Sequence, residues 1–187
     1  MSQEIGERST HTGDAFVDFA YDLLAYALPI LGCDWVAPPE FKRSTKKVFK
    51  DSFGDAIILY RARHAEEFEE GLRRYLAIEN GEEGVSYLQQ FCKRTFKGNI
   101  PLMEFIVYCA FLLNISICYS ELGDLEEVHR LADETFGVFY NYVEIYFTIV
   151  GGWHALYRVA EQYVDFVKFP SPRICLNQVQ KPWKNQN

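Results

Sequence analysis

The chain has 187 residues, of which 49% are hydrophobic and 16% aromatic, enough apolar material for the core of one domain. Its formal charge of −7 argues against general nucleic-acid binding, although local basic clusters stay open. Five widely spaced cysteines without a CxxC pair are typical of reduced thiols and speak against a disulfide framework or a metal site.

The first predicted helix covers residues 14–28. Apolar side chains recur there at helical spacing: Phe16, Phe19, Ala20, Leu23 and Ala27. The polar stretch 1–13 before it excludes a secretory signal and is predicted to be flexible. Pro29 and Gly32 mark the end of this helix.

A second helix is predicted over residues 41–63, after a loop that contains Pro38 and Pro39. It would carry a row of basic side chains at four-residue steps, formed by Lys42, Lys46 and Lys50. Such a row is either a solvated helix face or a patch for acidic partners.

The stretch 102–119 is apolar on every side of a helical wheel, with three clear interruptions: Glu104, Asn114 and Ser116. Two short amphipathic helices are predicted before it, over residues 66–78 and 85–95. A membrane span needs about 20 apolar residues and rarely holds a carboxylate. We therefore interpret 102–119 as a helix buried in the core of a globular domain.

Residues 125–150 carry a long apolar stripe that can pack along the buried helix. Two glycines at 151–152 end this element, and a last helical stretch is predicted over 153–169. The tail 170–187 is predicted to be irregular. The chain is therefore predicted to be all-α, with one domain at 14–169 in which about eight helices surround the buried one.

The sequence lacks the common motifs of catalysis. It contains no Gly-rich phosphate loop, nucleophile elbow or HExxH. Neighbouring acids such as Glu66 and Glu67 point in different directions on a helix, so they cannot act as a convergent pair. We predict a protein that is not an enzyme and needs no cofactor or metal.

Taken in chain order, at 17–19, 53–57, 96–111 and 146–156, four stretches resemble the homology motifs of the Bcl-2 family of apoptosis regulators. The most specific is YFTIVGGWHAL at 146–156, which is similar to the second motif through Gly151, Gly152 and Trp153. Val17-Asp18-Phe19 is similar to the fourth motif. Phe53-Gly54-Asp55-Ala56-Ile57 is similar to the third, or death-helix, motif, and 96–111 corresponds in place to the first.

The resemblance implies a Bcl-2-like bundle with a surface groove that receives the amphipathic death helix of a pro-apoptotic partner. It implies the following groove residues: Phe53, Ile57, Phe68, Phe91, Leu102, Met103, Glu104, Val107 and Phe111. The motif residues that it implies are Gly54, Asp55, Gly151, Gly152 and Trp153.

Two positions depart from the family pattern. Lys50 stands where the death helix normally has a leucine. Glu104 stands where the first motif has an arginine that pairs with an aspartate of the ligand helix, so its carboxylate would repel that aspartate. A substitute cation can come from Lys93, Arg94 or Lys97, or apolar anchors can suffice. Alternatively, Glu104 faces solvent, as an acid in the first turn of a helix often does.

The function implied is that of a pro-survival protein that sequesters death helices by stoichiometric binding. Two alternatives stay open: a pore-forming effector in which Gly54-Asp55 belong to an exposed death helix, and an unrelated helical scaffold or enzyme. The expected location is the cytoplasm. No hydrophobic run follows Val167, so association with the mitochondrial outer membrane would require a C-terminal anchor that has been removed. Homodimerisation is also left open.

Overall fold

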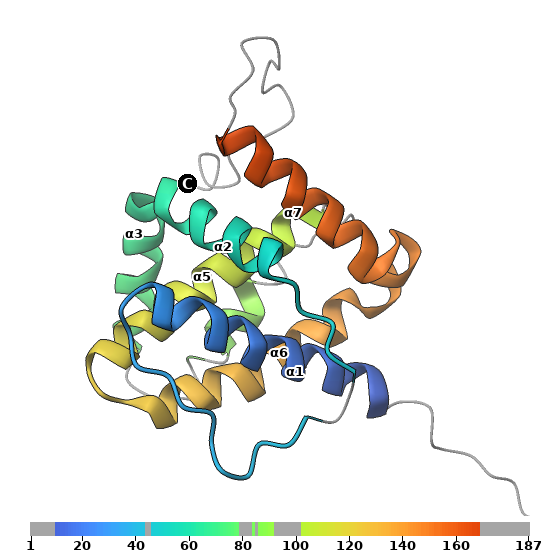
Figure 1. The fold of residues 1–187 in the computed structure, drawn as a ribbon. Helices are drawn as coiled ribbons and strands as arrows, with labels where there is room; N and C mark the ends of the chain where they lie inside the picture. The colour runs from blue at the N-terminus through green and yellow to red at the C-terminus, as the bar shows by residue number, and fades with distance from the viewer. Residues whose placement is uncertain (1–9, 44–45, 79–83, 85, 92–101, 169–187) are drawn as a thin grey trace, which may run out of the picture.

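A computed structural model describes residues 10–43, 46–78, 84, 86–91 and 102–168 (Figure 1). These residues form helices and connecting segments and contain no strand, which confirms the predicted all-α class. The helices are α1 (Thr10–Ile30), α2 (Asp51–Arg63), α3 (Ala65–Leu76), α5 (Leu102–Glu121), α6 (Leu125–Ile149) and α7 (Gly152–Lys168). Residues 84 and 86–91 are helical as well.

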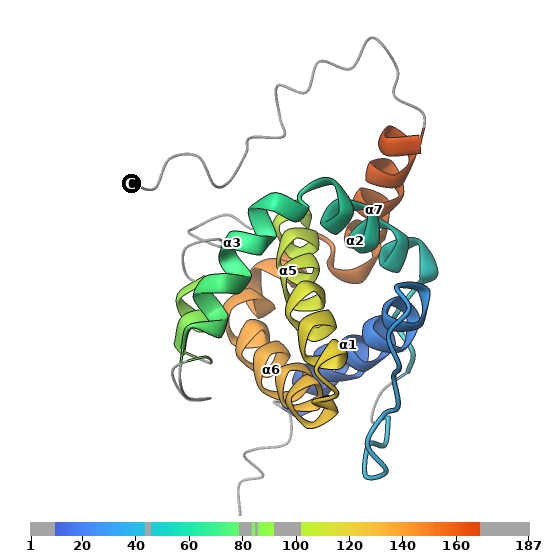
Figure 2. The ribbon, with the colours of Figure 1, turned by 90° about the vertical axis from the view of Figure 1, so that its left-hand side faces the viewer.

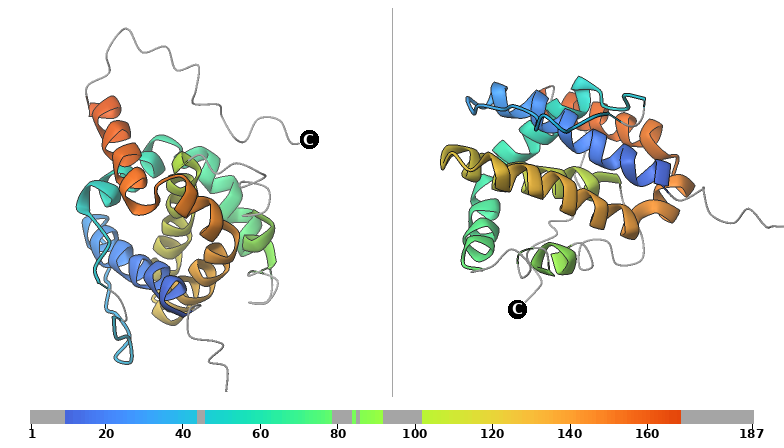
Figure 3. Two further views of the ribbon diagram at one scale, coloured as in Figure 1. Left: turned by 90° about the vertical axis from the view of Figure 1, so that its right-hand side faces the viewer. Right: turned by 90° about the horizontal axis from the view of Figure 1, so that it is seen from below.

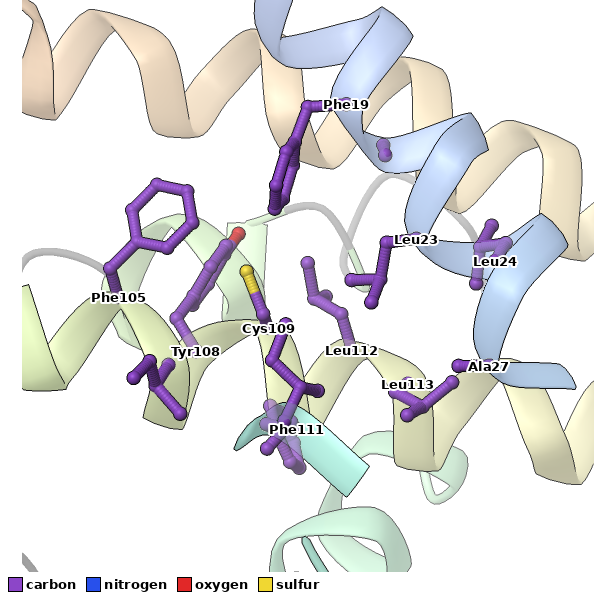
Figure 4. Close-up of a cluster of buried hydrophobic side chains, with 14 of the residues drawn as sticks. Phe19, Leu23, Leu24, Ala27, Phe105, Tyr108, Cys109, Phe111, Leu112 and Leu113 are labelled. Carbon is purple, nitrogen blue, oxygen red and sulfur yellow. The ribbon is translucent and has the colours of Figure 1, made fainter. Parts of the chain in front are cut away.

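Helix α5 is the centre of the bundle. Every residue from 105 to 117 is buried, and α1, α2, α6 and α7 pack around it (Figure 2). Side chains of α1, among them Phe19 and Leu23, face side chains of α5 such as Tyr108 and Leu112 (Figure 4). By length and composition α5 could cross a membrane, but 72% of its most apolar window is buried in the bundle. The predicted buried core helix is confirmed.

Helix α2 begins later than predicted. Residues 41–43 and 46–50 are not helical, and Lys50 has an extended backbone with φ −128° and ψ 143°. Two aromatic anchors explain the difference, because Phe41 stacks on Tyr21 with ring centroids 4.0 Å apart and Phe49 lies 5.7 Å from Phe19. Both anchors rest on α1, so the segment runs along that helix. The predicted basic row on one helix face is therefore wrong.

The remaining boundaries follow the sequence pattern closely. Helices α3, α6 and α7 start and end within a few residues of the predictions, and α1 begins at Thr10, before its predicted start. The predicted helix at 85–95 is described only up to residue 91. Residues 1–9 and the predicted irregular tail 170–187 lie outside the described residues.

Candidate functional site

The Gly-Gly-Trp stretch forms the turn from α6 to α7. Gly151 and Gly152 both have positive φ angles, 104° and 56°, which are unfavourable for residues with a side chain. The turn places Trp153 against α1 and α6, with its ring centroid 4.9 Å from that of Phe19 and 5.0 Å from that of Phe147. The motif thus fixes where α7 starts and how it packs on the core.

We expect Gly151→Ala to lower the free energy of unfolding by about 1–3 kcal/mol, the usual cost of holding a side chain in a disfavoured backbone region. The added Cβ would also lie 3.0 Å from the Cβ of Ala155. Denaturant unfolding measures the loss. His154→Ala, at an exposed position of the same turn, is the control, and equal stabilities of the two variants would contradict this account of the turn.

Gly54 and Asp55 hold α2 against α1. A Cβ on Gly54 would lie 2.3 Å from Cδ1 of Tyr26, so the close approach of the two helices requires glycine. The Tyr26 hydroxyl donates a hydrogen bond to Oδ1 of Asp55 at 2.7 Å. Burial, together with this carboxylate, raises the pKa of Tyr26 to about 12. In this structure the two motif residues contact the chain's own first helix.

Lys50 has a role that the sequence pattern did not indicate. It is the residue before α2, and its Nζ lies 4.5 Å from the ring centroid of Tyr157 on α7. An ammonium over an aromatic face is stabilised by the ring quadrupole. Lys50 therefore lies outside the helix and bridges the start of α2 to α7.

Three of the predicted groove residues meet in one aromatic cluster. The ring of Phe111 lies 5.0 Å from that of Phe91 and 6.1 Å from that of Phe68, so the cluster joins α3, the 86–91 segment and α5. Gly71 of α3 allows this contact, because a Cβ there would lie 2.9 Å from the Phe111 ring. All three phenylalanines are buried, because the solvent-exposed fraction is 0% for Phe111, 7% for Phe91 and 1% for Phe68.

Phe53 belongs to a different cluster. Its ring lies 5.2 Å from Phe19, 5.7 Å from Phe105 and 6.4 Å from Tyr157, on the side of α5 that faces α1 and α7. Ile57 and Val107 are buried too. All these predicted groove residues lie in the core of the described structure. The groove itself stays a prediction, since residues 92–101 between the 86–91 segment and α5 lie outside the described residues.

The first turn of α5 is the part of the predicted groove that reaches the surface. Leu102, Met103 and Glu104 are each half-buried. Oε2 of Glu104 is buried without a hydrogen-bond partner among the described atoms, and burial raises the pKa of this carboxyl to about 7. Glu104 is thus neither freely solvated nor enclosed. The candidate substitute cations, Lys93, Arg94 and Lys97, lie outside the described residues.

A polar contact inside the bundle was missed from the sequence. Nε of Arg61 on α2 donates a hydrogen bond of 2.9 Å to Oδ1 of Asn114 on α5. Asn114 is 8% exposed, and burial lowers the pKa of Arg61. An asparagine within an otherwise apolar helix was the available signal, because a buried amide needs a partner.

The described residues offer little room for a small ligand between α1, α5 and α6. The cavity there has a volume of about 10 Å³ and is lined by apolar side chains such as Leu24, Leu113 and Leu131. This is at the lower limit for one water molecule. No group of three or more His, Cys, Asp or Glu side chains placed to hold a metal occurs in this part of the chain.

Compared with known proteins, the chain matches no protein-family model and shows no significant similarity to any curated protein. The likeness to the Bcl-2 family therefore depends on the four stretches of sequence and their order.

Proposed function

We propose that this protein is a pro-survival, Bcl-2-like regulator that binds the death helix of a pro-apoptotic partner. One observation carries the proposal: an apolar helix, α5, is buried among amphipathic helices, and the Gly-Gly-Trp turn seats Trp153 against α1 beside it. Three of the stretches that resemble the family motifs fall on α1, α2 and the α6–α7 turn, and the described part of the fourth, residues 102–111, falls on α5. The all-α fold and the order of the motifs both support the proposal of a Bcl-2-like protein.

The binding surface lies between α3, the 86–91 segment and the start of α5. Phe68, Phe91 and Phe111 supply a continuous aromatic floor, and half-buried Leu102 and Met103 supply its edge. A death helix would place apolar anchors at i, i+3 or i+4, and i+7 on such a floor. Because the rings are covered in the free protein, binding must displace side chains or a segment that covers them.

Titration with a panel of death-helix peptides tests the proposal. We expect at least one peptide to bind with Kd below about 10 μM, which is about −7 kcal/mol. Failure of every peptide at that level would contradict the proposal. In a liposome-release assay we expect the protein to suppress release by an activated effector. Release caused by this protein alone would instead indicate a pore-forming effector.

The site is tested by Met103→Glu, which we expect to weaken peptide binding at least 10-fold by placing a charge at an apolar edge. Leu122→Glu is the matched control. Leu122 is 71% exposed and follows the far end of α5, about 30 Å away at 1.5 Å per residue. Isothermal titration calorimetry compares the two variants, with circular dichroism to check folding. An equal loss of peptide affinity in the two variants would contradict this placement of the groove.

A further inference from the structure

A basic segment, residues 41–50, links α1 to α2. It holds five of the chain's 19 lysines and arginines and no acid, although the chain as a whole carries a charge of −7. Glu40 and Asp51 stand at its two ends. This concentration of positive charge has no part in the proposed groove, which lies at α3 and the start of α5.

The described residues of the basic segment, 41–43 and 46–50, lie on the outside of the bundle, apart from the buried Phe49. Figures 2 and 3 show the described parts of the connection from α1 to α2 running along the outside of the helices, with one part projecting past them. Its two phenylalanines pack toward α1, whereas its five cations are all exposed. The anchors thus hold the backbone in place and leave the charges in solvent.

Two of the five cations have partners within the protein. Arg43 pairs with Asp22 on α1, and Lys50 lies over the ring of Tyr157. Among the described residues, no ion pair or hydrogen bond involves Lys42, Lys46 or Lys47. These three ammonium groups can therefore take an external anion without losing an internal contact.

Exposed apolar side chains lie on the stretch that precedes the basic segment and in the α5–α6 turn beside that stretch. Val36, in the stretch leading into the basic segment, is 67% exposed, and a 2.9 Å contact between Nε2 of His129 and its carbonyl oxygen holds that stretch on α6. Oγ of Ser120 donates to the carbonyl of Asp34, which places this stretch near the α5–α6 turn. Leu122 in that turn is 71% exposed.

Exposed lysines on a non-helical connecting segment suit a surface of many mobile anions better than one ligand of fixed shape. A lipid bilayer provides such a surface, and exposed apolar side chains can enter its interface. The negative charge on the rest of the protein is screened beyond about 8 Å at physiological salt, so it does not prevent contact through one face.

We propose that the basic segment is a docking surface for anionic lipid bilayers, with Lys42, Lys46 and Lys47 contacting the headgroups. This contact does not depend on the proposed groove. Each lysine near a membrane surface contributes about fivefold to partitioning, so the three together contribute on the order of 100-fold.

Vesicle flotation tests the proposal with two lipid compositions, pure phosphatidylcholine and a 7:3 mixture of phosphatidylcholine and phosphatidylserine. We expect the full chain to float with the anionic vesicles only, and to be released by 500 mM NaCl. The variant K42Q/K46Q/K47Q should partition on the order of 100-fold less. The control variant R73Q/R158Q/K168Q removes equal charge at exposed positions of α3 and α7 and should change partitioning much less.

Three outcomes would overturn the proposal. They are equal binding to neutral and anionic vesicles, equal loss in the two triple variants, and tighter binding to a single-stranded oligonucleotide or a poly-glutamate peptide than to anionic vesicles. Circular dichroism of both variants shows whether they are folded. The salt release of the unmodified protein tests the electrostatic contact even if a variant fails to fold.

Discussion

Gly54→Ala is expected to lower the free energy of unfolding by about 2 kcal/mol. The added Cβ would lie 2.3 Å from Cδ1 and 2.5 Å from Cε1 of Tyr26, so the tyrosine ring must move. Overpacking typically costs 1–3 kcal/mol, and moving the ring also breaks its hydrogen bond to Asp55, worth about 1 kcal/mol. The higher helix propensity of alanine offsets about 1 kcal/mol of this. Urea unfolding measures the result.

A double-mutant cycle separates the steric cost from other effects of Gly54→Ala. In a Tyr26→Ala background the ring is gone, so Gly54→Ala should cost little or even stabilise the protein. Tyr26→Phe removes only the hydrogen bond and should cost about 1 kcal/mol. An equal cost of Gly54→Ala with and without the Tyr26 ring would contradict the close contact between α1 and α2.

Glu104→Gln is expected to remove a pH dependence of stability between about pH 4.5 and 7. The pKa of Glu104 is raised to about 7 in the folded protein from an ordinary value of 4.5. Below pH 4.5 the carboxyl of Glu104 is protonated in both the folded and the unfolded protein. Between these two pKa values the unfolded chain loses the proton first, so stability falls as pH rises, and the loss is complete above pH 7.

We expect the free energy of unfolding of the parent protein to fall by about 1–2 kcal/mol between pH 5 and pH 8. This is less than the full pKa shift would give, because Glu104 is half-buried and water partly screens its charge. The measurement is urea unfolding of the parent protein and the variant across that range. Glu66→Gln is the control, an exposed acid in the first turn of α3, and should leave the pH dependence unchanged. Parallel curves for the parent and Glu104→Gln would contradict burial of this carboxyl.

The same variant bears on the proposed groove. If Glu104 lies opposite an aspartate of a bound death helix, its ionised form repels that aspartate. Glu104→Gln should then tighten peptide binding several-fold at pH 8 and have little effect at pH 5.5. Titration at the two pH values measures this. Unchanged affinity at both would place Glu104 away from the ligand's acid, without bearing on whether the groove binds.

The start of helix α2 could not be predicted from the sequence pattern. A helical spacing of lysines and apolar residues predicted a start near Phe41, yet the helix starts at Asp51. The positions of Phe41 and Phe49 in the sequence are equally compatible with one face of a helix and with a non-helical segment. Their contacts with α1 decide between the two, and no local pattern contains that information.

The candidate groove shows the same limit. The sequence suggested which apolar residues belong together, and the structure does bring Phe68, Phe91 and Phe111 into one cluster. It places Phe53 on another side of α5. Periodicity tells which side chains of a helix are buried, but the partner that buries each of them depends on how the helices cross.

The sequence by itself determined the burial of α5 and the turn at Gly151 and Gly152. A helix that is apolar on all sides must be enclosed, and a glycine pair between two helical stretches marks a turn. Only the tertiary structure decided the late start of α2, the glycine contact at Tyr26 and the raised pKa of Glu104. Each of these depends on atoms distant in the chain, whose packing sets the available space and excludes the water.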